Sequence, residues 1–180
     1  MSDSTEKMDA IVVGAGLAGL ATAYFLADAG LEVLVVERGD FPGSKNVTGG
    51  RIYLNPVRDL FPGLWEDAPL ERHVTRERLT AMARESATTI ELRSERFNRQ
   101  PYHSYTILRA KFDRWFADRV AEKGAFIIPK FKVDDLVFDD GRVAGIVAEG
   151  DEIRADVVVA ADGIMSLIAE KAGLRGKHQP

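Results

Sequence analysis

The chain has 180 residues, 46% hydrophobic and 29% charged, a composition typical of a globular protein with one domain or slightly more. Its 24 basic and 28 acidic residues give a net charge of −4, which argues against nucleic acid as a partner. The chain has no cysteine, which excludes disulfides, cysteine-ligated zinc, iron–sulfur ligation and a redox-active thiol within it.

The first apolar run ends at a Gly-x-Gly-x-x-Gly turn over residues 14–19. A helix is predicted over 17–29, and a second apolar run over 31–36 leads to Glu37, eighteen residues after the last of these glycines. This order is typical of a dinucleotide-binding βαβ unit, in which the second glycine lets the backbone approach a pyrophosphate and the acid binds a ribose. The helix N-terminus supplies free N–H groups for the phosphates. The alternative is a glycine-rich turn that only eases packing.

Residues 38–50 form a long segment too rich in glycine and proline for the crossover helix that a simple nicotinamide-binding domain would have next. Loops of this length are usually functional, and we expect this one to reach along the outer half of a long cofactor.

Residues 51–104 carry weaker signals: a short helix is predicted over 56–60, and two strands of an inserted sheet over 79–82 and 87–92. The charge-rich stretches on either side of these strands are interpreted as solvated surface. The three histidines, which have no metal-ligand spacing, are interpreted as surface residues, and no metal site is predicted: His73, His103 and His178.

A strand is predicted over 105–109, followed by a helix over 111–123. Four apolar side chains of this helix fall on one stripe and are interpreted as core: Phe112, Trp115, Phe116 and Val120. Another short strand is expected over 125–128.

Acid–glycine turns join three short predicted strands and indicate an antiparallel meander. The strands are expected over 132–138, 142–148 and 152–154. The apolar run at 156–160 is expected to be a central strand buried on both faces. Ser166 is a candidate cap for a helix that runs to residue 172.

The predicted fold class is α/β, with a Rossmann-like parallel sheet that contains the βαβ unit. A three-stranded antiparallel meander and part of an inserted substrate-domain sheet are also predicted, and the fold as a whole is expected to be truncated. The expected organisation is a βαβ unit with the flavin loop over 1–50, a partial inserted subdomain over 51–104, and a return to the first domain over 105–180.

Three motifs occur in a fixed order: GAGLAG with Glu37, PGSKNVTGGRIY over 42–53, and AADGIMS over 160–166. Together they resemble the glutathione-reductase-type FAD fold. Within it the chain resembles the FixC-like group, which is similar to electron-transfer-flavoprotein:quinone oxidoreductase, with geranylgeranyl reductases as more distant relatives. The KNVTGGR segment is the narrowest of these signals.

The resemblance implies FAD as the cofactor. Glu37 would face the adenosine ribose, Arg38 the adenine, and the backbone at Val133 the adenine as well. Asp162 would lie beside the pyrophosphate and the ribityl chain. The full predicted cofactor-binding set is Gly14, Ala15, Gly16, Leu17, Ala18, Gly19, Glu37, Arg38, Lys45, Asn46, Thr48, Gly49, Gly50, Arg109, Val133, Ala161, Asp162 and Gly163. For Arg109 the alternative is a solvent-facing ion-pair partner, and no side chain is predicted to be a catalytic acid or base.

The function that the resemblance implies is an FAD-dependent oxidoreductase in electron transport. It would take electrons from an electron-transfer flavoprotein and pass them to a quinone or a ferredoxin-like acceptor. A geranylgeranyl-reductase-like or monooxygenase-like enzyme is one alternative, and a non-catalytic nucleotide-binding module is another. Members of the family are longer, so a missing C-terminal half is an expected partner.

The polar N-terminus and the lack of a long apolar stretch predict a cytoplasmic protein, with peripheral contact at the inner face of the membrane left open.

Overall fold

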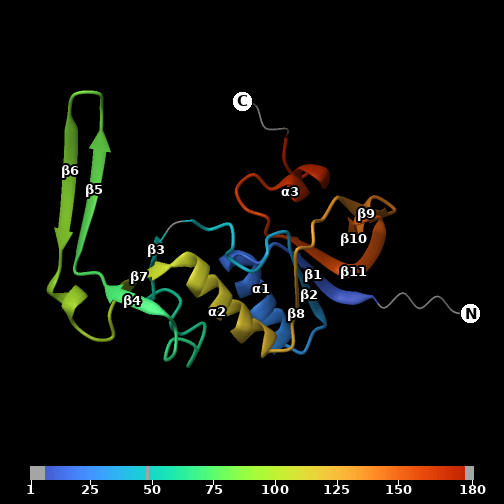
Figure 1. Cartoon of the computed structure of the whole chain (residues 1–180), viewed down its shortest axis with the longest axis horizontal. Helices are drawn as coiled ribbons and strands as arrows, with labels where there is room; N and C mark the ends of the chain where they lie inside the picture. The colour runs from blue at the N-terminus through green and yellow to red at the C-terminus, as the bar shows by residue number, and fades with distance from the viewer. Residues whose placement is uncertain (1–6, 48, 177–180) are drawn as a thin grey trace, which may run out of the picture. The chain divides into compact units, whose positions relative to one another are not determined.

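The computed structural model describes residues 7–47 and 49–176, and the chain forms two compact units (Figure 1). Unit 1 comprises Met1–Asn46 and Asp113–Pro180, and unit 2 comprises Val47–Phe112. No helix in the described part of the chain is long and apolar enough to cross a membrane.

Unit 1 is built on a six-stranded sheet with the order β8-β2-β1-β11-β10-β9. Its strands are β1 (Met8–Val13), β2 (Val33–Glu37), β8 (Phe126–Pro129), β9 (Asp135–Asp139), β10 (Arg142–Ala148) and β11 (Asp151–Ala160). β8, β2, β1 and the second half of β11 pair in parallel, whereas β9, β10 and the first half of β11 form an antiparallel meander. The predicted α/β fold is confirmed.

The two meander turns have the backbone that their acid–glycine sequences predict. Asp140 and Gly141 have φ of 47° and 78°, and Glu149 and Gly150 have φ of 53° and 92°. Two consecutive residues with positive φ make the turn that matches the twist of paired antiparallel strands.

β11 differs from the prediction in two ways. It is one continuous strand of ten residues rather than two, and its second half is not buried on both faces, since Val157 is 55% exposed. This half of β11 also has one open edge. β1 pairs with one edge of this half, while β10 pairs only with residues 151–154, so no described strand covers the other edge.

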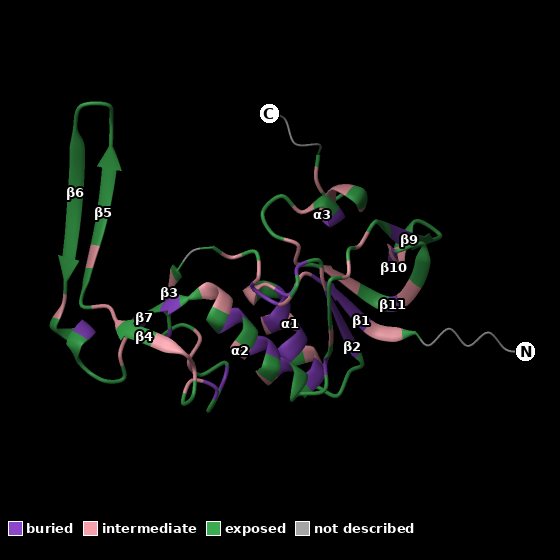
Figure 2. Cartoon of the chain, viewed as in Figure 1, coloured by how far each residue is buried: buried purple, intermediate pink, exposed green. Residues whose placement is uncertain are grey.

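Helix α1 (Leu17–Asp28) packs on β1 and β2 through small and apolar residues, including Leu20 and Ala23. Helix α2 (Arg109–Ala121) follows the predicted stripe, with Phe116 and Val120 buried, and the ring of Phe116 lies 6.3 Å from that of Tyr24. A short helix α3 (Leu167–Lys171) follows β11. Buried residues are concentrated on α1, β1 and β2, and α2, β9 and β10 add further residues to the core (Figure 2).

Unit 2 contains a three-stranded antiparallel sheet with the order β3-β7-β4. Its strands are β3 (Gly49–Tyr53), β4 (Leu70–His73) and β7 (Ser104–Leu108). A separate hairpin is formed by β5 (Arg76–Met82) and β6 (Ala87–Arg93), and the 3₁₀ turn η1 (Glu95–Asn98) follows it. The predicted hairpin strands are present.

Two predictions in this unit were wrong, and one strand was not predicted. The loop after Glu37 does not extend to residue 50, because Gly49 already pairs with Leu108 in β3. Residues 56–60 form turns rather than a helix. β4 was not predicted; it contains the first residues of a charge-rich stretch whose side chains are mostly exposed, as expected for solvated surface. In β3 and β4, pairing with the distant strand β7 decides the structure, because their own sequences have weak strand propensity.

Candidate dinucleotide site

The Gly-x-Gly-x-x-Gly turn uses its three glycines for different purposes. A Cβ on Gly14, which has φ of +105°, would lie 2.5 Å from the carbonyl oxygen of Ala161. A Cβ on Gly19 would lie 1.9 Å from the carbonyl oxygen of Gly14. Gly16 is different, because a Cβ there would meet nothing within 4 Å. The first and third glycines are therefore required by the fold itself, while the second faces open space.

An open pocket of about 280 Å³ lies at the carboxyl ends of β1, β2 and β11, in unit 1. This is the end of a parallel sheet at which ligands of open α/β folds bind. Eleven of the predicted site residues line it: Gly14, Ala15, Gly16, Glu37, Arg38, Lys45, Asn46, Val133, Ala161, Asp162 and Gly163. Its volume is slightly below the roughly 300–1,000 Å³ of pockets that enclose a drug-sized ligand, so it would hold only part of a dinucleotide.

Glu37 is fixed at the end of β2 by backbone donors. Its Oε2 accepts a hydrogen bond from the N–H of Ala15 at 3.0 Å, and its Oε1 accepts one from the N–H of Gly39 at 2.7 Å. The carboxylate is half-buried and borders the pocket. It is therefore oriented before any ligand binds.

The N-terminus of α1 faces the same pocket. Gly16 is the N-cap residue, and no side chain caps the helix there. Uncapped N–H groups at a helix N-terminus are suited to bind phosphate oxygens. Three cationic side chains also border the pocket, and they add positive charge for an anionic ligand: Arg38, Lys45 and Lys132.

The loop that follows β2 is anchored on α2. Nδ2 of Asn46 donates a hydrogen bond to Oδ2 of Asp113 at 2.6 Å, and Asp113 is fully buried. The guanidinium of Arg114 lies 3.9 Å from the ring centroid of Phe41. The side chain of Asn46 thus holds the loop in place at the edge of the pocket.

Asp162 stabilises the turn between β11 and α3. Its Oδ1 accepts a hydrogen bond from the hydroxyl of Ser166 at 2.7 Å, and its Oδ2 accepts one from the N–H of Ile168 at 3.1 Å. Ser166 in turn caps α3, since its Oγ accepts a hydrogen bond from the N–H of Ala169. Both carboxylate oxygens are therefore engaged within unit 1, and the turn presents Gly163 to the pocket.

Six other predicted site residues do not line this pocket, and a seventh, Thr48, lies outside the described residues. Gly19 lies beneath the turn against Gly14. In unit 2, the side chain of Arg109 lies against Gly50, where a Cβ would be 3.4 Å from its Cδ. The six are Leu17, Ala18, Gly19, Gly49, Gly50 and Arg109.

Several pocket residues were not predicted, among them Gly43, Phe131, Lys132 and Met165. The N–H of Phe131 donates a hydrogen bond to the carbonyl oxygen of Glu37 at 2.9 Å, which brings the segment after β8 to the end of β2. No local signal in the sequence reveals this contact, because 94 positions separate the two residues.

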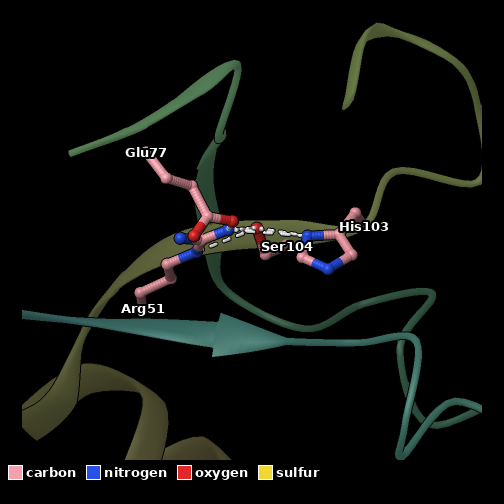
Figure 3. A network of polar contacts seen from close by, with 4 residues as sticks. All are labelled: Arg51, Glu77, His103 and Ser104. Atoms are coloured by element: carbon pink, nitrogen blue, oxygen red, sulfur yellow. Dashed lines mark hydrogen bonds and ion pairs between the residues drawn. The ribbon is translucent and has the colours of Figure 1, made fainter. Parts of the chain in front are cut away.

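Unit 2 has a polar network of its own (Figure 3). The Arg51 guanidinium donates to the hydroxyl of Ser104 from Nε at 3.0 Å and from Nη2 at 2.8 Å, and it forms an ion pair with Glu77. Ser104 is fully buried, and its Oγ lies 3.1 Å from Nδ1 of His103. The hydrogen bond from Arg51 holds the pKa of Glu77 below its ordinary value of 4.5. The network ties β3, β5 and β7 together.

The histidines in this unit pack against aromatic rings and are half-buried rather than on the surface. His103 stacks on Phe97 with a centroid distance of 5.2 Å, and His73 stacks on Tyr102 at 4.1 Å. His178 lies outside the described residues. Among residues 7–47 and 49–176, no group of three acidic or histidine side chains is placed to hold a metal ion.

A protein-family model described as FAD dependent oxidoreductase matches residues 9–108, which is more than half of the chain. This match indicates FAD as the cofactor.

Curated relatives match nearly the whole chain. Protein FixC of Escherichia coli O157:H7 is 45% identical over 177 residues, which are 98% of this chain and 41% of the relative. A probable electron transfer flavoprotein-quinone oxidoreductase, YdiS of Escherichia coli K12, is 43% identical over 98% of this chain and 41% of its own length. The chain therefore spans about two fifths of the length of these relatives. The predicted resemblance to the FixC-like group is confirmed.

A solved structure supports the fold. A geranylgeranyl bacteriochlorophyll reductase-like protein from Thermoplasma acidophilum superposes with a TM-score of 0.78 and is 27% identical. The match covers 94% of this chain and 43% of that protein.

Proposed function

The chain belongs to the FAD dependent oxidoreductase family, and from this premise we propose that it carries the dinucleotide-binding part of a FixC-type oxidoreductase in electron transport. The observation that carries the proposal is the uncapped N-terminus of α1 opposite an oriented Glu37 carboxylate, with both bordering one pocket. Donors for a pyrophosphate and an acceptor for a ribose are the two features that an adenine dinucleotide requires.

The residues of this chain would bind and orient the cofactor. The backbone at Gly16 would meet the pyrophosphate, Glu37 the ribose hydroxyls, and Arg38 the adenine. The loop that Asn46 anchors would continue along the cofactor towards its ring. Bound FAD supplies the electron-transfer chemistry, while the protein supplies binding, orientation and electrostatics.

We propose an electron-transfer flavoprotein as the electron donor and a quinone or ferredoxin-like protein as the acceptor. The support comes from the relatives, one of which is named a probable electron transfer flavoprotein-quinone oxidoreductase. We place the contacts with these partners in the portion of the relatives that this chain does not span. We propose a cytoplasmic location, with contact at the inner face of the membrane where a quinone is the acceptor.

A second candidate is the reduction of isoprenoid double bonds by the same bound flavin. The observation that favours it is the superposition on the geranylgeranyl bacteriochlorophyll reductase-like protein. The two candidates share the dinucleotide site and differ in the substrate that the remaining part of the protein would bind.

The proposal is tested by incubating the purified chain with FAD, desalting it and recording its visible absorbance. We expect flavin to be retained and ADP to compete for the site. A chain that ADP stabilises against heating but that loses flavin on desalting would show that only the adenosine half of the site is formed. If neither FAD nor ADP raises the unfolding temperature, the chain does not bind an adenine nucleotide and the proposal fails.

A further inference from the structure

The hairpin of unit 2 has two chemically different faces. Residues paired across its strands share a face, and successive residues alternate between faces. One face, the apolar hairpin face, carries Leu79, Ala81, Ile90 and Leu92, with Glu77 at its root and Thr88 near its turn. The opposite face carries mainly polar and charged residues, with Met82 and Ala87 beside the turn. Three arginines of this face contact the carboxylate of Glu91: Arg76, Arg78 and Arg93.

The apolar hairpin face is open to solvent in the described structure. Leu79 is 73% exposed, Ile90 is 67% exposed and Leu92 is 54% exposed. Figure 2 shows both strands exposed over most of their length, and β5 and β6 pair only with each other among the described strands. An alternating pattern with one apolar face is typical of a sheet that packs that face against protein.

A two-stranded ribbon is marginally stable in water unless another strand or a helix packs on it. The hairpin is nevertheless tied to the rest of unit 2 at its root, where Glu77 forms its ion pair with Arg51 of β3 (Figure 3). This contact fixes the direction in which the apolar hairpin face is presented within the unit, as a prepared docking surface would require.

We propose that the apolar hairpin face packs against the part of a FixC-type polypeptide that lies outside the matched two fifths. The relatives extend beyond the segment that this chain matches. Packing within one polypeptide suits so small a surface, because it does not incur the entropic cost of associating two molecules.

Two other occupants suit this surface less well. A second copy of the chain would need about 20–30 residues on each side for a standard interface, whereas this face offers four apolar side chains. A lipid surface would favour tryptophan and tyrosine at its boundary, and residues 76–93 contain no aromatic residue.

The test uses the absence of cysteine from the chain. Ala81→Cys places one thiol on the apolar hairpin face, and Ala87→Cys places one on the opposite face of the same hairpin. Both replaced residues are small and exposed, so neither change removes an apolar anchor. Each variant is labelled with a maleimide in the 180-residue chain, and again after that chain replaces the matched segment of Escherichia coli FixC.

In the 180-residue chain we expect the two thiols to react at rates within about twofold of each other. In the FixC chimera we expect the thiol at position 81 to react at least tenfold more slowly, with the thiol at 87 unchanged. If the chimera does not fold, the same two thiols are introduced at the aligned positions of Escherichia coli FixC itself, and the same protection is expected. Thiol labelling does not depend on flavin, so the labelling result and the flavin-binding result can fail independently of each other.

Equal reactivity of the two thiols in both forms would overturn the proposal. Protection of position 81 in the 180-residue chain that rises with protein concentration would instead identify a second copy as the occupant. Protection that appears only with vesicles of phosphatidylcholine and phosphatidylglycerol would identify a lipid surface. Either of these last two results would also contradict the proposal.

Discussion

The carboxylate of Glu37 lies 3.0 Å from the backbone nitrogen of Ala15 and accepts its hydrogen bond across 22 positions of sequence. This contact joins the end of β2 to the glycine turn after β1, which are the two parts of the βαβ unit that would meet the cofactor. A ligand that binds Glu37 therefore meets an acceptor already positioned by the turn.

Replacing Gly16 with valine should abolish dinucleotide binding while leaving the fold intact. Gly16 has φ of −80° and ψ of 177°, a conformation that valine adopts without strain, and no protein atom lies within 4 Å of its Cβ position. The added side chain would occupy the space that a pyrophosphate needs. FAD and ADP binding are measured by calorimetry, with the thermal midpoint as the test of folding.

Gly19→Ala is the control for this prediction. Its Cβ would lie 1.9 Å from the carbonyl oxygen of Gly14, so this variant should lower the thermal midpoint as well as weaken binding. Unchanged FAD affinity in Gly16→Val would show that the pyrophosphate does not approach the turn at this residue.

Replacing Glu37 with alanine should weaken FAD binding by about 1–3 kcal/mol, the usual effect of losing a hydrogen bond to a charged group. The effect should be smaller than that of Gly16→Val, because the space for the ligand remains. Titration with FAD and with ADP checks the prediction, and both affinities should fall by a similar factor. A loss confined to FAD would place Glu37 away from the adenosine.

Asn46→Ala should destabilise the chain rather than act directly on a ligand. Its amide donates to Asp113, which is fully buried, and removal of a donor from a buried carboxylate costs on the order of 1–3 kcal/mol. Urea unfolding measures the loss. Lys45→Ala, at the exposed neighbouring position, is the control and should change the free energy of unfolding by less than about 0.5 kcal/mol. Equal effects in the two variants would mean that the bond to Asp113 does not anchor the loop.

The sequence predicts best those features whose signals are local. The glycine turn, Glu37 and the two acid–glycine hairpins each depend on a few adjacent residues, and the structure forms them as expected. β3 and β4 were not predicted, because both depend on pairing with β7, which is 30 or more positions away. Long-range contacts of this kind leave no periodic pattern in the sequence.

In the candidate site too, the residues that belong to a local motif were predicted, whereas contacts between distant segments were not. The resemblance to the FAD fold predicts Asp162 at the cofactor site, and Asp162 does line the pocket, but the resemblance does not give the direction of its carboxylate. The structure shows both oxygens accepting hydrogen bonds from Ser166 and Ile168. Phe131 and Lys132 reach the pocket only because the chain after β8 bonds back to the end of β2.

The ion pair between Arg51 and Glu77 should make the stability of unit 2 depend on pH. The hydrogen bond from Arg51 lowers the pKa of Glu77 in the folded chain below its ordinary value of 4.5. A carboxyl group whose pKa is lower when folded stabilises the protein above its unfolded pKa, and this stabilisation is lost as the pH falls through the folded pKa. The Glu77→Gln variant should therefore melt below the wild type at pH 7, and the difference should shrink as the pH falls below 4.5.

Thermal midpoints of both proteins, recorded from about pH 7 down to about pH 3, check this dependence across the window in which the carboxyl group titrates. Glu85→Gln removes the same charge from the hairpin turn between β5 and β6. A change that both variants share reports the loss of one negative charge, whereas a change specific to Glu77→Gln reports the pair with Arg51. If the difference between Glu77→Gln and the wild type is constant with pH, the ion pair does not stabilise unit 2, and another contact must hold the root of the hairpin on β3.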